Sequence, residues 1–420
     1  MSTLSRRGQQ LIDTPPLAGY IGEHFARAAQ AWDATLRPDG YVALCIAENK
    51  RRAGDLMTRL GAYTSVPTDV LGYDAMIGNE AFRENLAGFL GRAFLGRRFA
   101  ADNLAVVAGA GSVLELLFHA LADEGQGVLV PTPSYAGFWA DLETRDGLRI
   151  VTVDTTFDEG FALTTEALDR AMAGAGCEVR ALLFTNPDNP LGKVASREQV
   201  EAIVAWAEAK QVHVVFDEIY ALSVFGDREF VSAASVRPSL GQYVHIVWAF
   251  SKDFGASGLR CGVLVSENAD VIAAVDQLAY WAACSGHTQW LLSQLVADEA
   301  SVDAYVAAMQ ADLRQTYGAV TAALGDAGIP YVPAEAAFFV VCDLRSWLEA
   351  PTVEAEGKLW RRLLEDANVN LTPGHACRIA EPGFFRLCYA GVPLAAVQTG
   401  IARIGGVLAR AGSRWVVHGV

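Results

Sequence analysis

A lysine follows directly after a strongly apolar segment of the sequence. The string HIVWAFSK runs from β-branched residues into Ser251 and Lys252, and Arg260 follows eight positions later. Burial at the end of a strand lowers the pKa of a lysine and makes its amine nucleophilic toward an aldehyde. This pattern therefore predicts a Schiff-base lysine at Lys252, and the alternative is an ordinary surface lysine after a strand.

A carboxylate ends a second apolar run. Asp217 follows VHVVF and Glu218 comes next, so in an extended strand the two side chains face opposite ways and form no acid/base pair. A buried carboxylate needs a cationic partner or strong donors. For Asp217 that partner is either an arginine in a structural salt bridge or the protonated ring nitrogen of a cofactor, which makes the ring an electron sink. Tyr220 could reach the same side if the chain bends.

The string AGAGSVLE predicts a phosphate site. The backbone N–H groups of Ala110, Gly111 and Ser112 would lie at the N-terminus of a helix, where anions bind readily. The string lacks the third glycine of GxGxxG, so it is not a dinucleotide fingerprint, and a plain strand-to-helix turn is the alternative. Similarly, Asn186 and Asn189 in TNPDNPLG are either site residues or parts of a common Asn-Pro turn.

The candidate residues follow short apolar runs that alternate with amphipathic segments. The runs GVLVPTPSY, VRALLFT, VHVVF and HIVWAF are separated by stretches such as SREQVEAIVAWAEAK, a pattern typical of buried parallel strands joined by helices. Ligands bind beyond the carboxyl ends of such strands, and so we expect one common site there. Its candidates, in chain order, are the loop at 110–112, Tyr135, Asn189, Asp217, Tyr220, Lys252 and Arg260.

The length and the pattern predict an α/β fold with two domains. A chain of 420 residues, 52% of them hydrophobic, is long for one simple domain. We expect an N-terminal arm and part of a small domain over residues 1–50, and a large domain with a mostly parallel sheet flanked by helices over 51–310. A smaller α+β domain is expected over 311–420, with a helix near Leu359 to Ala367.

Composition excludes several classes of partner. The net charge of -15 argues against nucleic acid or an anionic membrane surface as the main partner. The seven cysteines form no CxxC pair and the seven histidines no HxxxH pair, so we expect reduced thiols and no metal. No signal peptide is recognisable and no apolar segment approaches about 18 residues, which predicts a cytoplasmic protein without a membrane span.

Eight strings together resemble one enzyme family. They are IAEN, AGAGSVLE, PTPSYAGF, TNPDNPLG, DEIY, SKDFGASGLRCG, HTQWLLSQL and EPGFFRLCYA, and they extend over nearly the whole chain. The chain resembles the fold-type-I pyridoxal 5′-phosphate (PLP) enzymes of the class I/II aminotransferase superfamily. Within that superfamily it is most similar to the 1-aminocyclopropane-1-carboxylate (ACC) synthases. The resemblance implies PLP as the cofactor, an amino acid substrate and a homodimer with shared active sites.

The resemblance also implies a role for each candidate residue. Lys252 would hold PLP covalently and move protons at the substrate Cα, and Arg386 would grip the α-carboxylate as a bidentate fork. For Arg386 the alternative is a surface arginine on an edge strand. The implied PLP contacts are Asp217 at the pyridine nitrogen, Asn189 and Tyr220 at the phenolic oxygen, Tyr135 on the ring face, and Ala110, Gly111, Ser112, Arg260 and, more weakly, Ser251 at the phosphate.

Two residues near the N-terminus bear on the substrate. In the resemblance, Glu48 of IAEN matches the ACC-synthase glutamate that faces the sulfonium of S-adenosylmethionine (SAM). Tyr20 lies 28 positions earlier, at the spacing of a substrate-contacting tyrosine in the family. A carboxylate beside a fixed positive sulfur favours a cationic substrate. The alternative for Glu48 is an exposed acid at the end of a strand.

Two positions depart from the ACC-synthase pattern. Ala249 replaces a phosphate-binding serine, and Met76 replaces a tyrosine, whose role Tyr73 would take at the ordinary aminotransferase spacing. We expect Tyr20 or Tyr73 to be contributed by the neighbouring chain.

The resemblance implies a reaction as well as a cofactor. We expect a SAM-processing PLP enzyme that breaks the Cγ–S bond and releases methylthioadenosine. The four-carbon fragment would either close to ACC or be coupled at Cγ to a second small substrate, for example a nucleotide such as NAD. An ordinary aminotransferase is the main alternative, and a PLP-binding regulator without catalysis is a more remote one.

Overall fold

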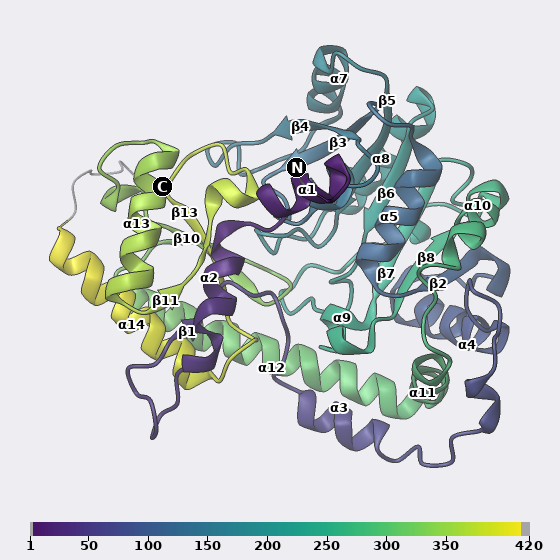
Figure 1. Ribbon diagram of the computed structural model, residues 1–420, viewed down its shortest axis with the longest axis horizontal. Helices are drawn as coiled ribbons and strands as arrows, with labels where there is room; N and C mark the ends of the chain where they lie inside the picture. The colour runs from purple at the N-terminus through teal and green to yellow at the C-terminus, as the bar shows by residue number, and fades with distance from the viewer. Residues whose placement is uncertain (1–2, 413–420) are drawn as a thin grey trace.

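A seven-stranded sheet forms the centre of the larger part of the molecule (Figure 1), a computed structural model that describes residues 3–412. Its strand order is β2-β8-β7-β6-β5-β3-β4. β8 is antiparallel to β2 and β7, and the other neighbouring pairs are parallel. The predicted, mostly parallel sheet is therefore confirmed. The strands are β2 (Leu104–Val107), β3 (Gly127–Thr132), β4 (Arg149–Asp154), β5 (Val179–Thr185), β6 (His213–Asp217), β7 (Val244–Ala249) and β8 (Gly262–Ser266).

Helices cover both faces of this sheet. Alternate strand residues divide between two apolar cores: Leu183 and Val215 pack in the core with Leu117 of α5, whereas Leu182 and Val214 belong to the core on the opposite face. This alternation explains why the strands read as continuous apolar runs. The helices of this part are α4 (Glu80–Leu90), α5 (Ala110–Leu121), α6 (Phe138–Glu143), α7 (Thr165–Gly174), α8 (Arg197–Lys210), α9 (Phe250–Asp253), α10 (Ala269–Ala279) and α11 (Gly286–Ala297).

The smaller part is built on a four-stranded antiparallel sheet of order β12-β13-β10-β9. The long helix α12 (Glu299–Asp326) runs along both parts and includes position 310, at which the sequence predicted a domain boundary (Figure 1). Residues 413–420 of the predicted small domain lie outside the described residues. The other elements are β9 (Tyr331–Val332), β10 (Phe339–Asp343), α13 (Val353–Asp366), β11 (Val369–Asn370), β12 (Thr372–Pro373), β13 (Phe384–Cys388) and α14 (Leu394–Ala411).

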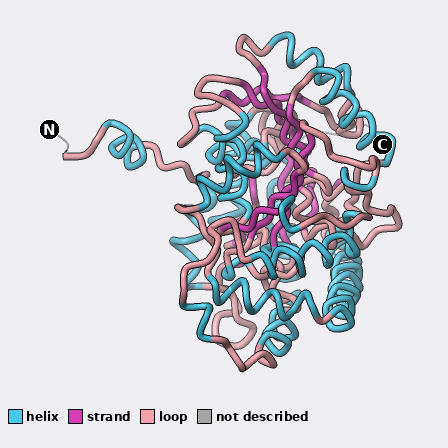
Figure 2. The backbone as a smooth tube through the Cα atoms, turned by 90° about the vertical axis from the view of Figure 1, so that its right-hand side faces the viewer, coloured by secondary structure: helices cyan, strands magenta, loops and turns pink. Residues whose placement is uncertain are grey.

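Among the described residues, the N-terminal region contains three α-helices before α4. Figure 2 shows the first of them projecting from the body of the molecule. The apolar run around residues 41–49 contains only the short strand β1 (Val42–Ala43), which pairs with β11. The Leu44 carbonyl that follows β1 accepts the N–H of Cys388 in β13, whereas the carbonyls of Cys45 and Ala47 accept hydrogen bonds from side chains of the site. The helices are α1 (Arg6–Asp13), α2 (Gly19–Arg27) and α3 (Ala53–Leu60).

Within residues 3–412, no helix is both long enough and apolar enough to cross a bilayer.

Two histidines form a buried pair at the amino ends of β6 and β7. His213 Nδ1 lies 3.0 Å from His245 Nε2, and His245 Nδ1 lies 2.9 Å from Ser266 Oγ. Burial lowers the pKa of His213 to about 4 and the pKa of His245 to about 3. Both rings are therefore neutral in the folded protein at neutral pH.

We expect this histidine pair to destabilise the protein in acid. Unfolded histidines have a pKa of 6.5, so below this pH the unfolded chain binds more protons than the folded one, and stability is lost down to about pH 4. His213→Asn keeps a polar group but does not titrate. Between about pH 7 and about pH 5 the variant should lose less free energy of unfolding than the wild type, measured by urea denaturation. Equal losses would show that the pair does not control acid stability.

Candidate active site

Lys252 lies in α9, directly after the carboxyl end of β7. Its Nζ donates a hydrogen bond to the carbonyl oxygen of Ala47 at 2.8 Å. Burial, together with the nearby Arg386 charge, lowers the pKa of Lys252 from its ordinary value. A lowered pKa raises the share of the neutral, nucleophilic amine.

The helix that carries Lys252 is fixed by a residue that the sequence reading did not single out. The Asp253 carboxylate is buried and accepts hydrogen bonds from Trp248 Nε1 at 2.9 Å, Ser223 Oγ at 2.6 Å and the Leu222 N–H at 3.1 Å. A carboxylate directly after a lysine at a strand end was the available signal. Asp253 therefore orients the turn on which Lys252 lies.

Asp217 ends β6 and is buried at the same edge of the sheet. Its Oδ1 accepts the N–H of Ile219 at 3.3 Å, and burial raises the pKa of Asp217 to about 7. The next residue, Glu218, accepts hydrogen bonds from Ser232 Oγ at 2.7 Å and the Ala233 N–H at 2.8 Å. The two carboxylates thus have separate environments, as expected for neighbours in a strand. Asp217 needs a cation in order to remain ionised near neutral pH.

Arg386 lies in β13, between β12 and β10, and only 2% of it is exposed. Its Nη1 donates to Asn189 Oδ1 at 2.9 Å, and its Nη2 donates to Cys45 O and Thr372 Oγ1, both at 3.0 Å. All three acceptors are neutral oxygens, and the buried Nε has no hydrogen-bond partner. This is not the surface arginine of the alternative interpretation. A buried guanidinium with neutral partners is suited to bind a carboxylate.

Three tyrosines lie near enough to Arg386 to interact with its charge. Burial raises the pKa of Tyr20 and Tyr220, and in both cases the Arg386 charge opposes this effect, whereas Tyr135 is 36% exposed. Tyr220 is fully buried, and its hydroxyl lies 3.3 Å from Asn189 Nδ2. Since the phenols remain protonated at neutral pH, they can donate hydrogen bonds to a ligand. The ring of Tyr135 packs edge-to-face on Phe138 at 5.2 Å.

The predicted phosphate loop lies at the amino end of α5, which begins at Ala110. The N–H groups of Ala110, Gly111 and Ser112 are the first of this helix and have no acceptor within it. The Nη2 of Arg260 donates to Ala108 O at 3.2 Å, beside this loop. Gly109 has φ +92, and an added Cβ would lie 2.5 Å from that Nη2, so only glycine fits there. The free N–H groups and the Arg260 guanidinium at this helix end are suited to bind an anion.

Glu48 belongs to the segment of residues 45–50, which bonds to both Lys252 and Arg386. The carbonyl of Ala47 accepts from Lys252 and that of Cys45 accepts from Arg386, so the backbone of this segment joins the two cationic side chains. The Glu48 side chain is 35% exposed and forms an ion pair with Lys50 at 2.7 Å. Lys50 was not singled out from the sequence, although it lies two positions after Glu48.

The remaining predicted residues differ in how far their side chains are buried. Ser251 and Ala249 are buried next to Lys252, and Met76 is partly buried against the core that includes Val107. Tyr73 is 98% exposed and is thus not part of the site of its own chain.

Asn186 also shapes the site. Its Oδ1 accepts the N–H of Ala195 at 2.9 Å and its Nδ2 donates to Val231 O at 3.3 Å. Asn186 is buried and follows β5 directly. It therefore holds the loop that carries Asn189, a structural role that leaves the site contact to Asn189.

Comparison with known proteins gives one consistent result. Residues 48–404 match the model of the aminotransferase class I and II family. The sequence is 36% identical to 1-aminocyclopropane-1-carboxylate synthase 4 of Oryza sativa subsp. japonica, covering 89% of this chain and 83% of that protein. It is 34% identical to synthase 3 of the same plant, covering 96% and 94%. Aspartate aminotransferase from Thermus thermophilus with maleate has the same fold, with TM-score 0.81, 24% identity, and 97% and 100% coverage.

Proposed function

Because the chain belongs to the PLP-dependent class I and II aminotransferase family and is ACC synthase-like within it, we propose that it acts on SAM. The proposed reaction removes the Cα proton and breaks the Cγ–S bond, which releases methylthioadenosine. One observation carries the proposal: a single segment, residues 45–50, contacts Lys252 and Arg386 and also contains Glu48. An amine, a carboxylate-binding arginine and an acid for a sulfonium are thereby brought together.

The residues around Lys252 fit PLP. The pKa of Asp217 is raised by burial, and a protonated pyridine nitrogen would supply the cation that this carboxylate needs. The amino end of α5 and Arg260 would hold the phosphate, and Tyr220 and Asn189 would bind the phenolic oxygen. When bound, PLP withdraws electrons from the substrate Cα and makes its proton acidic.

Charged and polar side chains of the protein would each act on a different part of the substrate. Arg386 would bind the α-carboxylate and fix the Cα–H bond in position, because its guanidinium is buried and has no anionic partner. Lys252 would accept the Cα proton, since its lowered pKa suits a base at neutral pH. Glu48 would stabilise the sulfonium end, and the phenol of Tyr220 stays protonated as a donor.

The ion pair between Glu48 and Lys50 should influence the affinity of the protein for SAM. Glu48→Gln should raise the KM for SAM by about tenfold without lowering PLP content, because one charged contact to the sulfonium is lost. Lys50→Gln should instead lower the KM, because the carboxylate is no longer paired. Steady-state kinetics and the absorbance of bound PLP measure the two effects. A parallel loss of SAM use and PLP in Glu48→Gln would identify a structural acid.

The fate of the four-carbon fragment is a separate part of the proposal. We propose that it closes to ACC or is attacked at Cγ by a second small substrate, for example a nucleotide such as NAD. The departures at Ala249 and Met76 support a site altered from the ACC-synthase pattern. Mass spectrometry of reactions with SAM, alone and with candidate nucleophiles, distinguishes these products.

We also propose a homodimer in which Tyr73 completes the partner's site. Tyr20 is buried in its own chain near Arg386, so the expectation of a shared tyrosine now rests on Tyr73. Tyr73 is 98% exposed and Leu71 is 86% exposed, which leaves an apolar segment free for a second copy.

Mixing two inactive variants tests the shared site. In a heterodimer of Lys252→Ala and Tyr73→Ala, one site receives both native residues, so random mixing should restore about a quarter of wild-type activity. Each variant alone serves as the control. A mixture no more active than its components would show that Tyr73 does not cross the interface.

A further inference from the structure

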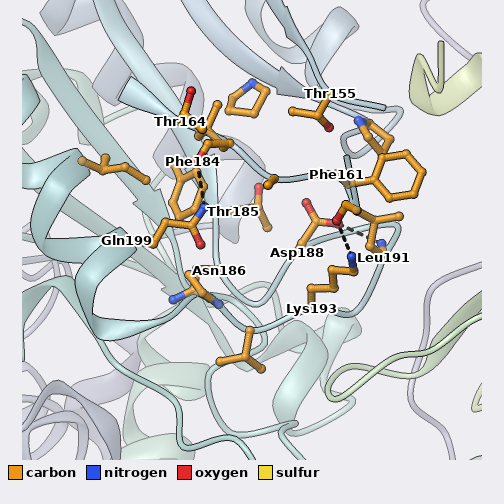
Figure 3. A pocket seen from close by; sticks show the side chains of 18 of the residues that line it. Thr155, Phe161, Thr164, Phe184, Thr185, Asn186, Asp188, Leu191, Lys193 and Gln199 are labelled. Carbon is orange, nitrogen blue, oxygen red and sulfur yellow. Dashed lines mark hydrogen bonds between the residues drawn. The ribbon is translucent and has the colours of Figure 1, made fainter. Parts of the chain in front are cut away.

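A cavity of about 1140 Å³ is lined in part by Asp188 and Leu191, on either side of Asn189 (Figure 3). It is formed by the carboxyl ends of β3 and β5, by the segments 155–166 and 184–195, and by residues 332–335 of the smaller part. Its described lining includes neither Lys252 nor Arg386. Its volume is sufficient for a small organic ligand.

Aromatic side chains form part of the wall of this cavity. Phe157, Phe161 and Phe184 all line it, with the first two rings 6.1 Å apart. Ala202 and Ile203 of α8 add apolar surface on another side. Such walls favour a ligand with a flat, largely apolar ring.

One polar group in the cavity has no partner. Thr185 is only 8% exposed, and its Oγ1 makes no hydrogen bond among the described residues. In Figure 3 its side chain lies between Gln199 and Asp188. The Oγ1 atom is buried in the cavity wall, so a ligand would bond to it only after the Thr185 side chain rotates, and that bond would recover the free energy that an unpartnered hydroxyl costs.

The charges around the cavity disfavour an anionic ligand. Five acidic residues line it, against two cationic ones: Asp158, Glu166, Asp188, Glu198 and Glu335 against Lys193 and Arg228. Both cations already have partners, since Lys193 Nζ donates to Gly160 O at 2.5 Å and Arg228 to Val194 O at 3.3 Å. Repulsion by the carboxylates disfavours phosphorylated molecules, whereas carboxylates accept hydrogen bonds from ribose hydroxyls.

We propose that this cavity binds an uncharged nucleoside, with its base against the phenylalanine rings, a base edge on Thr185 and its ribose hydroxyls on the carboxylates. The cavity is coupled to the active site by a shared loop. Asp188 and Leu191 line it, whereas Asn189 between them bonds to Tyr220 and Arg386. The inference does not depend on the proposed reaction.

Calorimetric titration of the PLP-loaded protein with adenosine tests this inference. We expect a sub-millimolar dissociation constant for adenosine. Thr185→Val and Ala202→Trp should each raise this constant by about tenfold or more. Thr185→Val removes an unpaired hydroxyl and so should not lower the unfolding temperature. Ala205→Trp, at an exposed position of α8 outside the cavity lining, should bind like the wild type and is the matched control.

Two further measurements test whether adenosine binds outside the active site and whether the cavity rejects phosphorylated ligands. Glu48→Gln should leave adenosine binding unchanged even if it impairs SAM use, and adenosine 5′-monophosphate should bind more weakly than adenosine. The inference is overturned if the wild type does not bind adenosine, if Thr185→Val and Ala202→Trp bind it normally, or if the monophosphate binds more tightly.

Discussion

Replacing Lys252 by alanine is expected to reduce turnover by at least about 10³-fold. The variant loses the buried amine that would accept the Cα proton, and general base catalysis contributes about 10²–10⁴-fold to such steps. The same change removes the group that would hold PLP covalently, so the absorbance band of lysine-bound PLP should also be absent. The structure accounts for this sensitivity because the Lys252 amine has a lowered pKa and bonds to the segment that contains Glu48.

The control for this variant is a lysine outside the site. Lys210→Ala removes a lysine that pairs with Asp169 at the end of α8, and its turnover and absorbance should match those of the wild type. Retained turnover in Lys252→Ala would contradict every interpretation in which Lys252 takes part in catalysis.

Arg386→Lys is expected to lower kcat/KM by about 10²–10³-fold. The guanidinium already donates to Asn189, Cys45 and Thr372, and only its planar, multi-donor shape can keep these bonds and bind a carboxylate as well. A lysine ammonium would lose the bidentate contact, and hydrogen bonds between charged groups are worth about 1.5–3 kcal/mol each. The effect should include a higher KM for the amino acid.

A second arginine provides a matched control. Arg345 makes two hydrogen bonds to Asp343 in the smaller part of the molecule, at 2.9 and 2.8 Å. Arg345→Lys should change stability slightly and leave the KM unchanged. If both variants had the same KM as the wild type, Arg386 would not bind the substrate carboxylate.

The site residues that sequence reasoning could locate are those that directly follow a strand. Asp217 and Lys252 end two apolar runs, and parallel strands place such ends at one edge of the sheet. The helix with Ala110 at its start was likewise predicted from a glycine turn. Local pattern thus sufficed for the central sheet and for the edge at which Asp217 and Lys252 lie.

Contacts between distant segments could not be predicted from local pattern. Arg386 bonds to Asn189 and Cys45, which lie 197 and 341 positions away in the sequence. Likewise, only tertiary contacts show that the carbonyls of Cys45 and Ala47 accept hydrogen bonds from Arg386 and Lys252. The ion pair of Glu48 with Lys50 and the unpartnered hydroxyl of Thr185 depend on side-chain placement, which periodicity does not determine.

The most direct test of the central claim is a product assay with SAM. Purified PLP-loaded protein is mixed with SAM, and methylthioadenosine is quantified while the absorbance of the cofactor is followed. Our account predicts repeated turnover, with methylthioadenosine released and the cofactor returned to its starting form. No methylthioadenosine, together with a keto acid from another amino acid and conversion of the cofactor to its amine form, would contradict it and identify an ordinary aminotransferase.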